Sequence, residues 1–274
     1  GTIQSFATYD AALVHVRDGY PDWVLFRRGD SFATTLDPAE GRSEAEMALI
    51  ASYGEESTLP IIAPPNPDTA VISKILRRGD NIVHSAVVAL DLYSPTRDPD
   101  NPAYSGPSGS MGFRLLIGGT EPIDAEVNQS GILENFLIEG CRIRFFTGNN
   151  IQVIEDSHGY ARDIVLRRNR IENNYSDGNG HSQGMFSSGI DGLLLEENIF
   201  YHNGWNRQNN EDGVTDAEEA TMFNHNIYYY NARNARFVRN ISIMPSSMNF
   251  KFTSGEASGS SGPMLFDDNL FIDG

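Results

Sequence analysis

Cysteine and positive charge are both scarce in this 274-residue chain. Its single cysteine, Cys141, excludes an internal disulfide framework and a cysteine-rich zinc site. The 20 Lys and Arg residues stand against 37 Asp and Glu residues, which gives a formal net charge of −17. This balance disfavours sequence-independent binding to nucleic acid, which needs cations to neutralise phosphates. No hydrophobic run approaches the roughly 18 residues of a membrane span, so we expect neither nucleic acid nor membrane as a partner.

The first residues also lack the basic start and apolar stretch of a signal peptide. The acidic, cysteine-poor composition, rich in Gly, Asn and Ser, nevertheless fits a secreted bacterial protein. We therefore expect an extracellular or periplasmic protein whose signal peptide lies outside this sequence. A cytoplasmic protein is the alternative.

What the sequence does contain is an internal repeat, which sets the fold class. Four segments share a central asparagine, and the steps between these asparagines are 29, 42 and 29 residues. A fifth segment places Gly140 another 29 residues upstream, and the long step holds an insertion of 42 − 29 = 13 residues. The position three residues before the asparagine is always apolar, and the position one before it is always charged. The asparagines are Asn169, Asn198, Asn240 and Asn269; the apolar column is Leu137, Leu166, Leu195, Phe237 and Phe266; the charged column is Glu139, Arg168, Glu197, Arg239 and Asp268.

Such columns are expected where parallel strands stack about 4.8 Å apart. The charged column would form a ladder of ion pairs on the outer face. The asparagines would bond through their amides at a sharp turn, where this residue tolerates left-handed backbone. We therefore predict an all-β protein, a right-handed parallel β-helix with coils of about 29 residues. A β-propeller is disfavoured because its repeats usually run to about 40 residues or more.

The whole chain, 1–274, is predicted to form one β-helix domain. Residues 1–22 are expected to form an N-terminal cap with a short helix that shields the open end of the core. Residues 93–110, rich in Pro, Ser and Gly, read as a surface loop, and 206–220 form the insertion. Because no cap is visible before residue 274, we expect the natural chain to continue, as a monomer or as a trimer. Further strands are predicted at 183–189, 225–231 and 248–255.

Three stretches carry a resemblance to known proteins: AALVHVRDGYPDWVLFRRGDSF, GHSQGMFSSGIDGLLLEENIFYHNGW and MFNHNIYY. They resemble coils of bacterial right-handed β-helix carbohydrate-active proteins, the pectate-lyase-like superfamily. That group includes polysaccharide lyases, uronate epimerases and some glycoside hydrolases, so one fold hosts several chemistries. The acidic calcium cluster and the catalytic arginine of pectate lyases align with no position in this chain. The resemblance implies a groove for an extended sugar chain on the flat outer side of one sheet.

Side chains for such a groove would come from the strand before each asparagine. Gln183 and His225 each lie 15 residues before their asparagine, whereas Lys251 lies 18 before its own. The three align if the turn after Lys251 carries a three-residue insertion, and they are then predicted to stack on neighbouring coils. The flanking residues would be His181, Asn226 and Tyr228.

This set suits β-elimination, which removes the C5 proton beside a uronate carboxylate and expels the O4-linked sugar. Lys, His, Gln and Asn can neutralise the carboxylate as an enolate-like intermediate forms, and Ca²⁺ can take their place. We predict His225 as base or carboxylate neutraliser, Lys251 as base and Tyr228 as proton donor. The roles of His225 and Lys251 are exchangeable, and for each residue taken alone a structural role is the alternative.

Other features have both a structural and a functional interpretation. His202 is expected to be a turn histidine in a column shared with Asn173, with substrate binding as the alternative. Trp205 beside it is either buried or a sugar-stacking rim. The acidic insertion is expected to be a solvated loop, with a Ca²⁺ site as the alternative. Its weak metal candidates are Asp212, Asp216 and Glu218, and the arginines expected to pair with neighbouring acids are Arg167, Arg168 and Arg170.

The sequence thus predicts a polysaccharide lyase acting on a uronic-acid polymer, with an acidic polysaccharide as its partner. The alternatives are a uronate epimerase, a glycoside hydrolase, or a non-catalytic carbohydrate-binding or tailspike-like β-helix. An inverting hydrolase needs two carboxylates about 6.5–9.5 Å apart. The predicted column contains none, unless Asp191 or the insertion reaches in.

Overall fold

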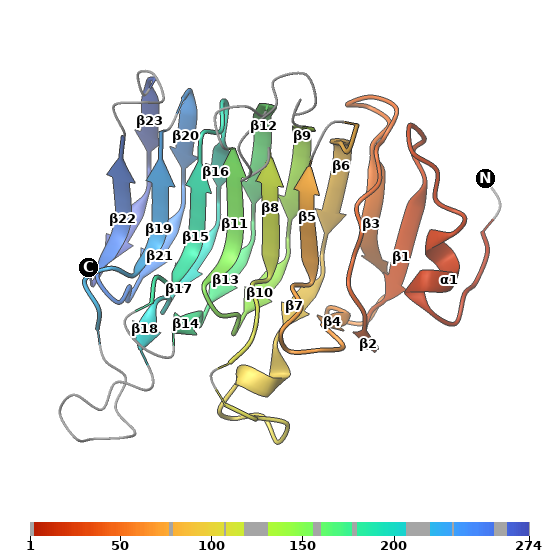
Figure 1. The fold of residues 1–274 in the computed structure, drawn as a ribbon, viewed down its shortest axis with the longest axis horizontal. Coiled ribbons are helices and arrows are strands. Elements are labelled where there is room, and N and C mark those ends of the chain that lie inside the picture. Colours follow the sequence, from red (N-terminus) through yellow and green to blue (C-terminus); the bar gives the residue numbers. More distant parts are fainter. Residues whose placement is uncertain are drawn as a thin grey trace, which may run out of the picture.

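The structure is a computed structural model that describes residues 3–76, 79–106, 108–117, 131–155, 160–176, 180–206, 220–231, 233–254 and 262–273. Within these residues the chain winds as a right-handed parallel β-helix, as predicted (Figure 1). Strands from successive coils lie side by side and pair in parallel, so that the coils build three long sheets, A, B and C, along one axis. Each full coil passes through the sheets in the order C, A and B.

All three sheets are parallel throughout, and neighbouring strands in each sheet come from neighbouring coils. Sheet A contains β1 (Trp23–Arg27), β3 (Ala48–Tyr53), β6 (Ile82–Val88), β9 (Ile132–Glu139), β12 (Tyr160–Arg167), β16 (Leu194–Glu196), β20 (Ala235–Val238) and β23 (Met264–Asp267). Sheet B contains β2 (Ser31–Ala33), β4 (Ile61–Ala63), β7 (Asp91–Tyr93), β10 (Arg142–Arg144), β13 (Arg170–Glu172), β17 (Ile199–Tyr201), β21 (Ile241–Ile243) and β24 (Leu270–Ile272). Sheet C contains β5 (Ile72–Leu76), β8 (Phe113–Ile117), β11 (Asn149–Glu155), β15 (Gln183–Ser188), β19 (His225–Tyr230) and β22 (Met248–Thr253), and a small ladder pairs β14 (Tyr175–Ser176) with β18 (Trp205–Asn206).

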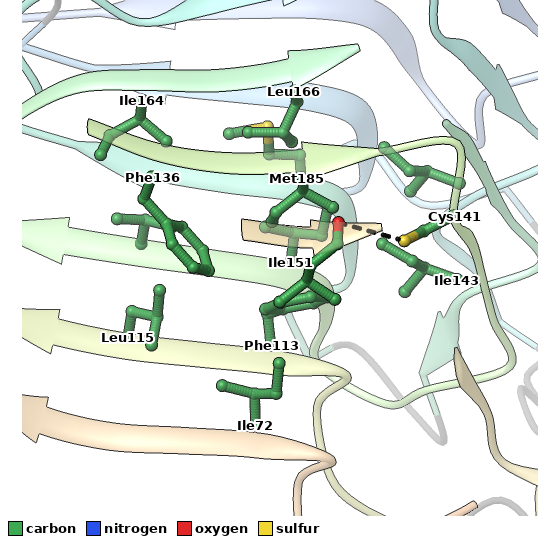
Figure 2. Close-up of a cluster of buried hydrophobic side chains, with 14 of the residues drawn as sticks. Ile72, Phe113, Leu115, Phe136, Cys141, Ile143, Ile151, Ile164, Leu166 and Met185 are labelled. Atoms are coloured by element: carbon green, nitrogen blue, oxygen red, sulfur yellow. Dashed lines mark hydrogen bonds between the residues drawn. The ribbon is translucent and has the colours of Figure 1, made fainter. Parts of the chain in front are cut away.

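The core is made of columns of inward side chains, because alternate residues of a strand point to opposite faces of the sheet. In sheet C, Phe113 pairs with Ile151, Ile151 with Met185, and Met185 with Ile227. All four side chains are buried, and Figure 2 shows several of them among the apolar residues that fill the coil. Burying a side chain of this size stabilises the fold by roughly 1.5–3 kcal/mol, so a repeated inward pattern holds each coil to the next.

The predicted asparagine ladder is present at the turn between sheets A and B. The backbone N–H and the side-chain Nδ2 of Asn169 both donate to Oδ1 of Asn198, at 3.0 Å each. Asn198 bonds to Asn240 in the same way, again at 3.0 Å. The left-handed residue is, however, the charged one just before, with φ of 56° at Arg168 and 55° at Glu197. The charged residue makes the turn, and this leaves the asparagine aligned to bond along the stack.

One copy of the repeat is shifted by a residue from the predicted alignment. Sheet A pairs Leu166 with Ile138, 166 − 138 = 28 residues upstream. Ile138 rather than Leu137 therefore fills the buried apolar column. Gly140 takes the left-handed position with φ of 62°, and Cys141 takes the position of the asparagine. The turn accepts glycine because this residue has no Cβ to oppose a positive φ.

The predicted cap contains a short helix, α1 (Tyr9–Leu13), which lies beside β1 at the N-terminal end of the coils (Figure 1). Its first turn is capped by Thr8, whose hydroxyl accepts from the backbone N–H of Ala11 at 3.2 Å. Tyr9 is buried and stacks on Phe26 with ring centroids 5.7 Å apart. The helix therefore covers the apolar interior of the first coil.

The segment 93–110 is a surface loop only in part. It contains a short 3-10 turn, η1 (Pro95–Arg97), and Arg97 is fully buried. Its guanidinium donates to the carbonyl oxygens of Phe145 at 3.0 Å and Tyr175 at 2.6 Å. It also lies 4.0 Å from the ring centroid of Tyr175. A buried cation is tolerated in this loop because backbone carbonyls satisfy it, and it fastens the loop to two coils.

In the described part of the chain, no helix is long and apolar enough to cross a membrane.

Candidate functional site

The outward face of sheet C carries two columns of side chains, fixed by the pairing of its strands. They alternate along each strand with the inward residues of the core. Within the described strands, neither column contains Asp or Glu. The first column is Ser73, Arg114, Gln152, Phe186, Tyr228 and Lys251, and the second column is Ile75, Leu116, Ile154, Ser188, Tyr230 and Thr253.

Lys251 lies 251 − 248 = 3 residues further along its strand than the sequence predicts. It pairs with Tyr228, and Met248 pairs with His225. The prediction that Lys251 stacks directly on His225 is therefore wrong. Met248 lies 269 − 248 = 21 residues before Asn269, so the intervening turn holds 21 − 15 = 6 extra residues instead of three.

His225, Tyr228 and Lys251 nevertheless form one cluster on the face of sheet C. The ring of Tyr228 meets His225 edge-on, with centroids 5.8 Å apart, and Lys251 Nζ lies 4.7 Å from the centroid of the Tyr228 ring. A cation at this distance from an aromatic face is attracted by it. Tyr228 also packs on Phe186 at 5.1 Å, and its hydroxyl shares a 3.0 Å hydrogen bond with Thr253 Oγ1. A phenol, an ammonium group and an imidazole are thus brought together.

His225 has no exposed surface, and neither ring nitrogen has a hydrogen-bond partner among the described residues. Burial, followed by the charges of Lys251 and His181, lowers the pKa of His225 from 6.5 to about 4. The imidazole is therefore neutral at pH 7, with one N–H donor and one free lone pair. Leaving a buried polar group unpartnered costs about 1–3 kcal/mol. A fold that bears such a cost in a cluster of titratable groups makes this residue a candidate for function.

Gln183 is buried, and its side chain serves the fold. Its Oε1 accepts from the backbone N–H of His225 at 2.6 Å, and its Nε2 donates to the carbonyl of Phe223 at 3.0 Å. Its own backbone N–H donates to Oδ1 of Asn149 at 3.1 Å. Gln183 thus ties three coils together and holds the backbone of His225 in place. This buried position does not support the predicted contact with substrate.

Asn226 belongs to a second asparagine ladder that the sequence reasoning missed. Its Oδ1 accepts from the backbone N–H and the Nδ2 of Asn203, at 3.3 and 2.9 Å, and Asn203 Oδ1 accepts from the backbone N–H of Asn174. All three asparagines are fully buried, so Asn226 is also a structural residue. The signal was present, because Asn174 and Asn203 each follow a residue of the first ladder by five positions and are 29 apart.

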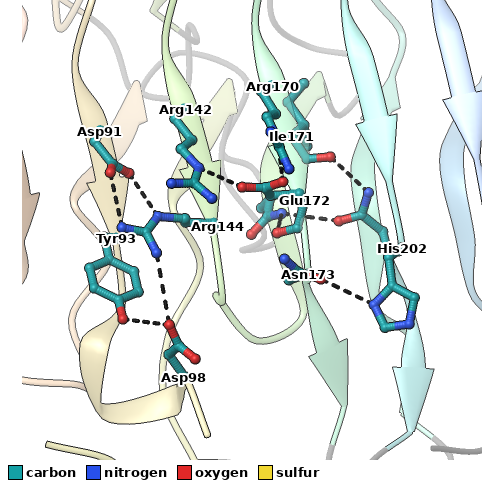
Figure 3. A network of polar contacts seen from close by, with 12 residues as sticks. Asp91, Tyr93, Asp98, Arg142, Arg144, Arg170, Ile171, Glu172, Asn173 and His202 are labelled. Atoms are coloured by element: carbon teal, nitrogen blue, oxygen red, sulfur yellow. Dashed lines mark hydrogen bonds and ion pairs between the residues drawn. The ribbon is translucent and has the colours of Figure 1, made fainter. Parts of the chain in front are cut away.

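His202 is a turn histidine, as predicted. Its backbone is left-handed with φ of 53°, and its Nδ1 lies 3.1 Å from Oδ1 of Asn173 (Figure 3). Its ring stacks on Trp205 at 5.4 Å and 16°. Trp205 is half-buried, and its indole N–H donates to the carbonyl of Met244 at 3.1 Å. The two rings brace this turn, so the predicted substrate-binding roles of both have no support from the contacts.

The three predicted structural arginines are all paired with carboxylates. Arg167 binds Glu139 at 2.8 Å, and Arg168 binds the same carboxylate from the neighbouring position. Arg170 binds Glu172, whose side chain is fully buried beneath the outer face of sheet B (Figure 3). Their charges are used within the fold, so they do not form a basic patch for an acidic substrate.

His181 is exposed and packs on Phe223 with ring centroids 5.6 Å apart. It lies near enough to His225 for its charge to contribute to the lowered pKa of that residue. The metal candidates Asp212, Asp216 and Glu218 lie outside the described residues. Among the residues that the structure does describe, no group of three or more His, Cys, Asp or Glu side chains is arranged to hold a metal ion.

Fold and site together define the class: a parallel β-helix protein whose outer sheet carries a polar and aromatic cluster around a neutral histidine. Comparison of the chain with protein-family models, with curated proteins and with solved structures gives no match.

Proposed function

We propose that this protein is a polysaccharide lyase that cleaves a uronic-acid polymer by β-elimination on the outward face of sheet C. The observation that carries the proposal is the fully buried, neutral His225, whose nitrogens lack partners among the described residues and lie beside a phenol and an ammonium group. The resemblance of the sequence to pectate-lyase-like coils supports the same reaction class. A polymer substrate also accords with an extracellular site of action.

The lowered pKa of His225 supports one assignment of the two roles that the sequence left exchangeable. A neutral imidazole can accept a proton but brings no positive charge to a uronate carboxylate, whereas the ammonium group of Lys251 does, so we assign His225 as the base and Lys251 as the cation that pairs with the uronate. His225 takes the C5 proton, the released electron pair forms the C4–C5 double bond, and the C4–O4 bond breaks. The hydroxyl of Tyr228 gives its proton to the departing O4 and later regains one from His225 through solvent.

Because His225 has no exposed surface, a sugar carbon reaches it only after a neighbouring side chain shifts. The half-buried ring of Tyr228 meets the imidazole edge-on, and the flexible chain of Lys251 ends over that ring. These two side chains are the ones whose movement on polymer binding opens the site. Exclusion of water until then keeps the imidazole neutral and strengthens the electrostatic contacts made inside.

A glycoside hydrolase is not favoured, because neither outward column of sheet C contains a carboxylate in its described strands. Epimerisation shares the first proton abstraction but returns a proton to C5 without breaking the chain. Product analysis therefore separates all three reactions.

The test is ultraviolet absorbance during incubation with alginate, pectate, glucuronan and glycosaminoglycans, using wild type, His225→Gln and the turn variant His202→Gln. We expect the absorbance band of the unsaturated uronate to grow with wild type and with His202→Gln. We expect no such band with correctly folded His225→Gln. New reducing ends without that band would make the protein a hydrolase. Altered C5 configuration without chain cleavage would make it an epimerase, and either outcome overturns the proposal.

A further inference from the structure

We propose that the first column of sheet C is a binding track for an anionic polysaccharide and that Arg114 is a second carboxylate-binding residue, remote from His225. This inference rests on the proposed function and deepens it. Arg114 and Lys251 are the two cations of the column's described residues and are separated by four strand steps. At about 4.8 Å per step, their positions lie ~19 Å apart along the β-helix axis, a span of several sugar units.

The side chains between the two cations suit a sugar chain. Gln152 presents an amide that can both donate to and accept from hydroxyl groups. Phe186 and Tyr228 offer half-buried aromatic surfaces that pack on each other at 5.1 Å, and aromatic faces are suited to contact the apolar faces of sugar rings. The second column flanks this floor with the hydroxyls of Ser188, Tyr230 and Thr253.

The charge of the column is opposite to that of the chain. The protein carries a net charge of −17, whereas the first column, as far as its strands are described, holds two cations and no carboxylate. A local field of this kind can concentrate an anionic polymer against the global charge. The column is therefore selective for anionic chains over neutral ones.

Arg114 also differs from the ion-paired arginines on the other two outer faces. Arg144 of sheet B is bound by Asp91 at 3.0 Å, and Arg167 of sheet A is bound by Glu139 at 2.8 Å. No described carboxylate forms an ion pair with Arg114. It is half-exposed, so its guanidinium remains available for a planar, two-point contact with a uronate carboxylate.

The expected consequence is a dependence on chain length. A short oligomer bound at Lys251 cannot reach Arg114, whereas a chain that spans four strand steps engages both cations. A charge-assisted hydrogen bond contributes about 1.5–3 kcal/mol, which corresponds to roughly a 10- to 100-fold change in affinity. Loss of Arg114 should therefore weaken the binding of long oligomers by at least about tenfold and leave short ones unchanged.

The experiment compares Arg114→Gln with Arg236→Gln, a control in an exposed arginine on the outer face of sheet A. Binding of size-fractionated oligogalacturonates and oligoalginates, from disaccharides to octasaccharides, is measured by calorimetry, with neutral cello-oligosaccharides as the uncharged probe. Kinetics of wild type and both variants are measured on the same series. The expected result is a higher KM for long oligomers, unchanged kcat, and partial rescue by Arg114→Lys.

The failures of the two proposals are distinguishable. Length-dependent anionic binding that requires Arg114, without formation of unsaturated products, supports the track and rejects the lyase. Elimination with equal behaviour of Arg114→Gln and Arg236→Gln rejects the track and leaves the lyase intact. A loss of affinity that is the same for all oligomer lengths, or equal for neutral chains, also overturns the assignment of Arg114.

Discussion

Replacing His225 by leucine is expected to stabilise the fold while it abolishes elimination. The imidazole is fully buried, and its two nitrogens lack partners among the described residues. Leucine is of similar size and has no polar atom to leave unsatisfied. Because an unpartnered buried polar group costs about 1–3 kcal/mol, the free energy of unfolding at pH 7 should rise by about that amount. Active sites commonly sacrifice stability in this way.

The gain in unfolding free energy from His225→Leu should increase in acid, because the pKa of His225 differs between the folded and unfolded chain. Its pKa falls from 6.5 to about 4 on folding, chiefly through burial. Between these values the unfolded state binds more protons, so the wild-type fold loses stability as the pH falls from 6.5 to 4. A difference of 6.5 − 4 = 2.5 units corresponds to about 3 kcal/mol. His225→Leu lacks this contribution and should show a correspondingly shallower dependence on pH.

The assay is urea unfolding at several pH values between 4 and 8, followed by tryptophan fluorescence and circular dichroism. A shift in midpoint at constant slope reports a change in stability, and each kcal/mol raises Tm by roughly 2–4 °C. The matched control is Gln183→Leu, which removes the acceptor of the His225 backbone N–H and should destabilise the fold by about 1–3 kcal/mol. A His225→Leu protein that is less stable than wild type at pH 7, or that keeps the wild-type pH dependence, would refute the reasoning.

Three further substitutions test the ladder, the packing and the chemistry. Asn198→Ala removes an acceptor of two Asn169 donors in the buried ladder and should cost about 2–4 kcal/mol of unfolding free energy in the urea assay; a cost below about 1 kcal/mol would argue against the ladder. Gly184→Ala would bring a Cβ to 2.6 Å from a backbone oxygen and should lower stability by about 1–3 kcal/mol, whereas Gly180→Ala, with no described atom within 4 Å, should be neutral. Tyr228→Phe should lower kcat by about 10²–10⁴-fold with little change in Tm; a wild-type kcat would remove this phenol from the mechanism.

The fold could be predicted because its signals repeat. The asparagines at steps of 29, 42 and 29 residues form a bonded ladder, and a slip in any coil would break both that ladder and the apolar column beside it. In the one misaligned copy, Gly140 and Cys141 replace the charged residue and the asparagine of the repeat. That copy therefore lacks the residues on which the alignment depends. Repetition thus carries enough information to fix the strands and most of their register.

The site could be predicted only in part, because its placement depends on turn lengths that the repeat does not fix. His225 and Lys251 both lie near the ring of Tyr228, yet Lys251 pairs with Tyr228 instead of His225 because the following turn is longer than the alignment assumed. The sequence also does not show which polar side chains are buried. It predicts Gln183 in the groove, but in the structure this side chain is hydrogen-bonded to backbone groups. No sequence pattern indicates that the two nitrogens of His225 lack partners among the described residues, because this follows from the packing of several coils.

The contrast between repeated and varied columns gives the physical reason to look for function on sheet C. Inward columns must stay apolar, and the turn columns must keep their amides, so neither can vary from coil to coil without loss of stability. The first column of sheet C changes its chemistry at most coils, and it bears no such constraint because its side chains face outward. On the outer faces of sheets A and B, some charged side chains stabilise the fold through ion pairs, as Arg167 and Arg170 illustrate. The first column of sheet C does not repeat, and it lies beside a histidine whose nitrogens lack described partners. Selection for binding a ligand therefore explains its sequence better than selection for stability does.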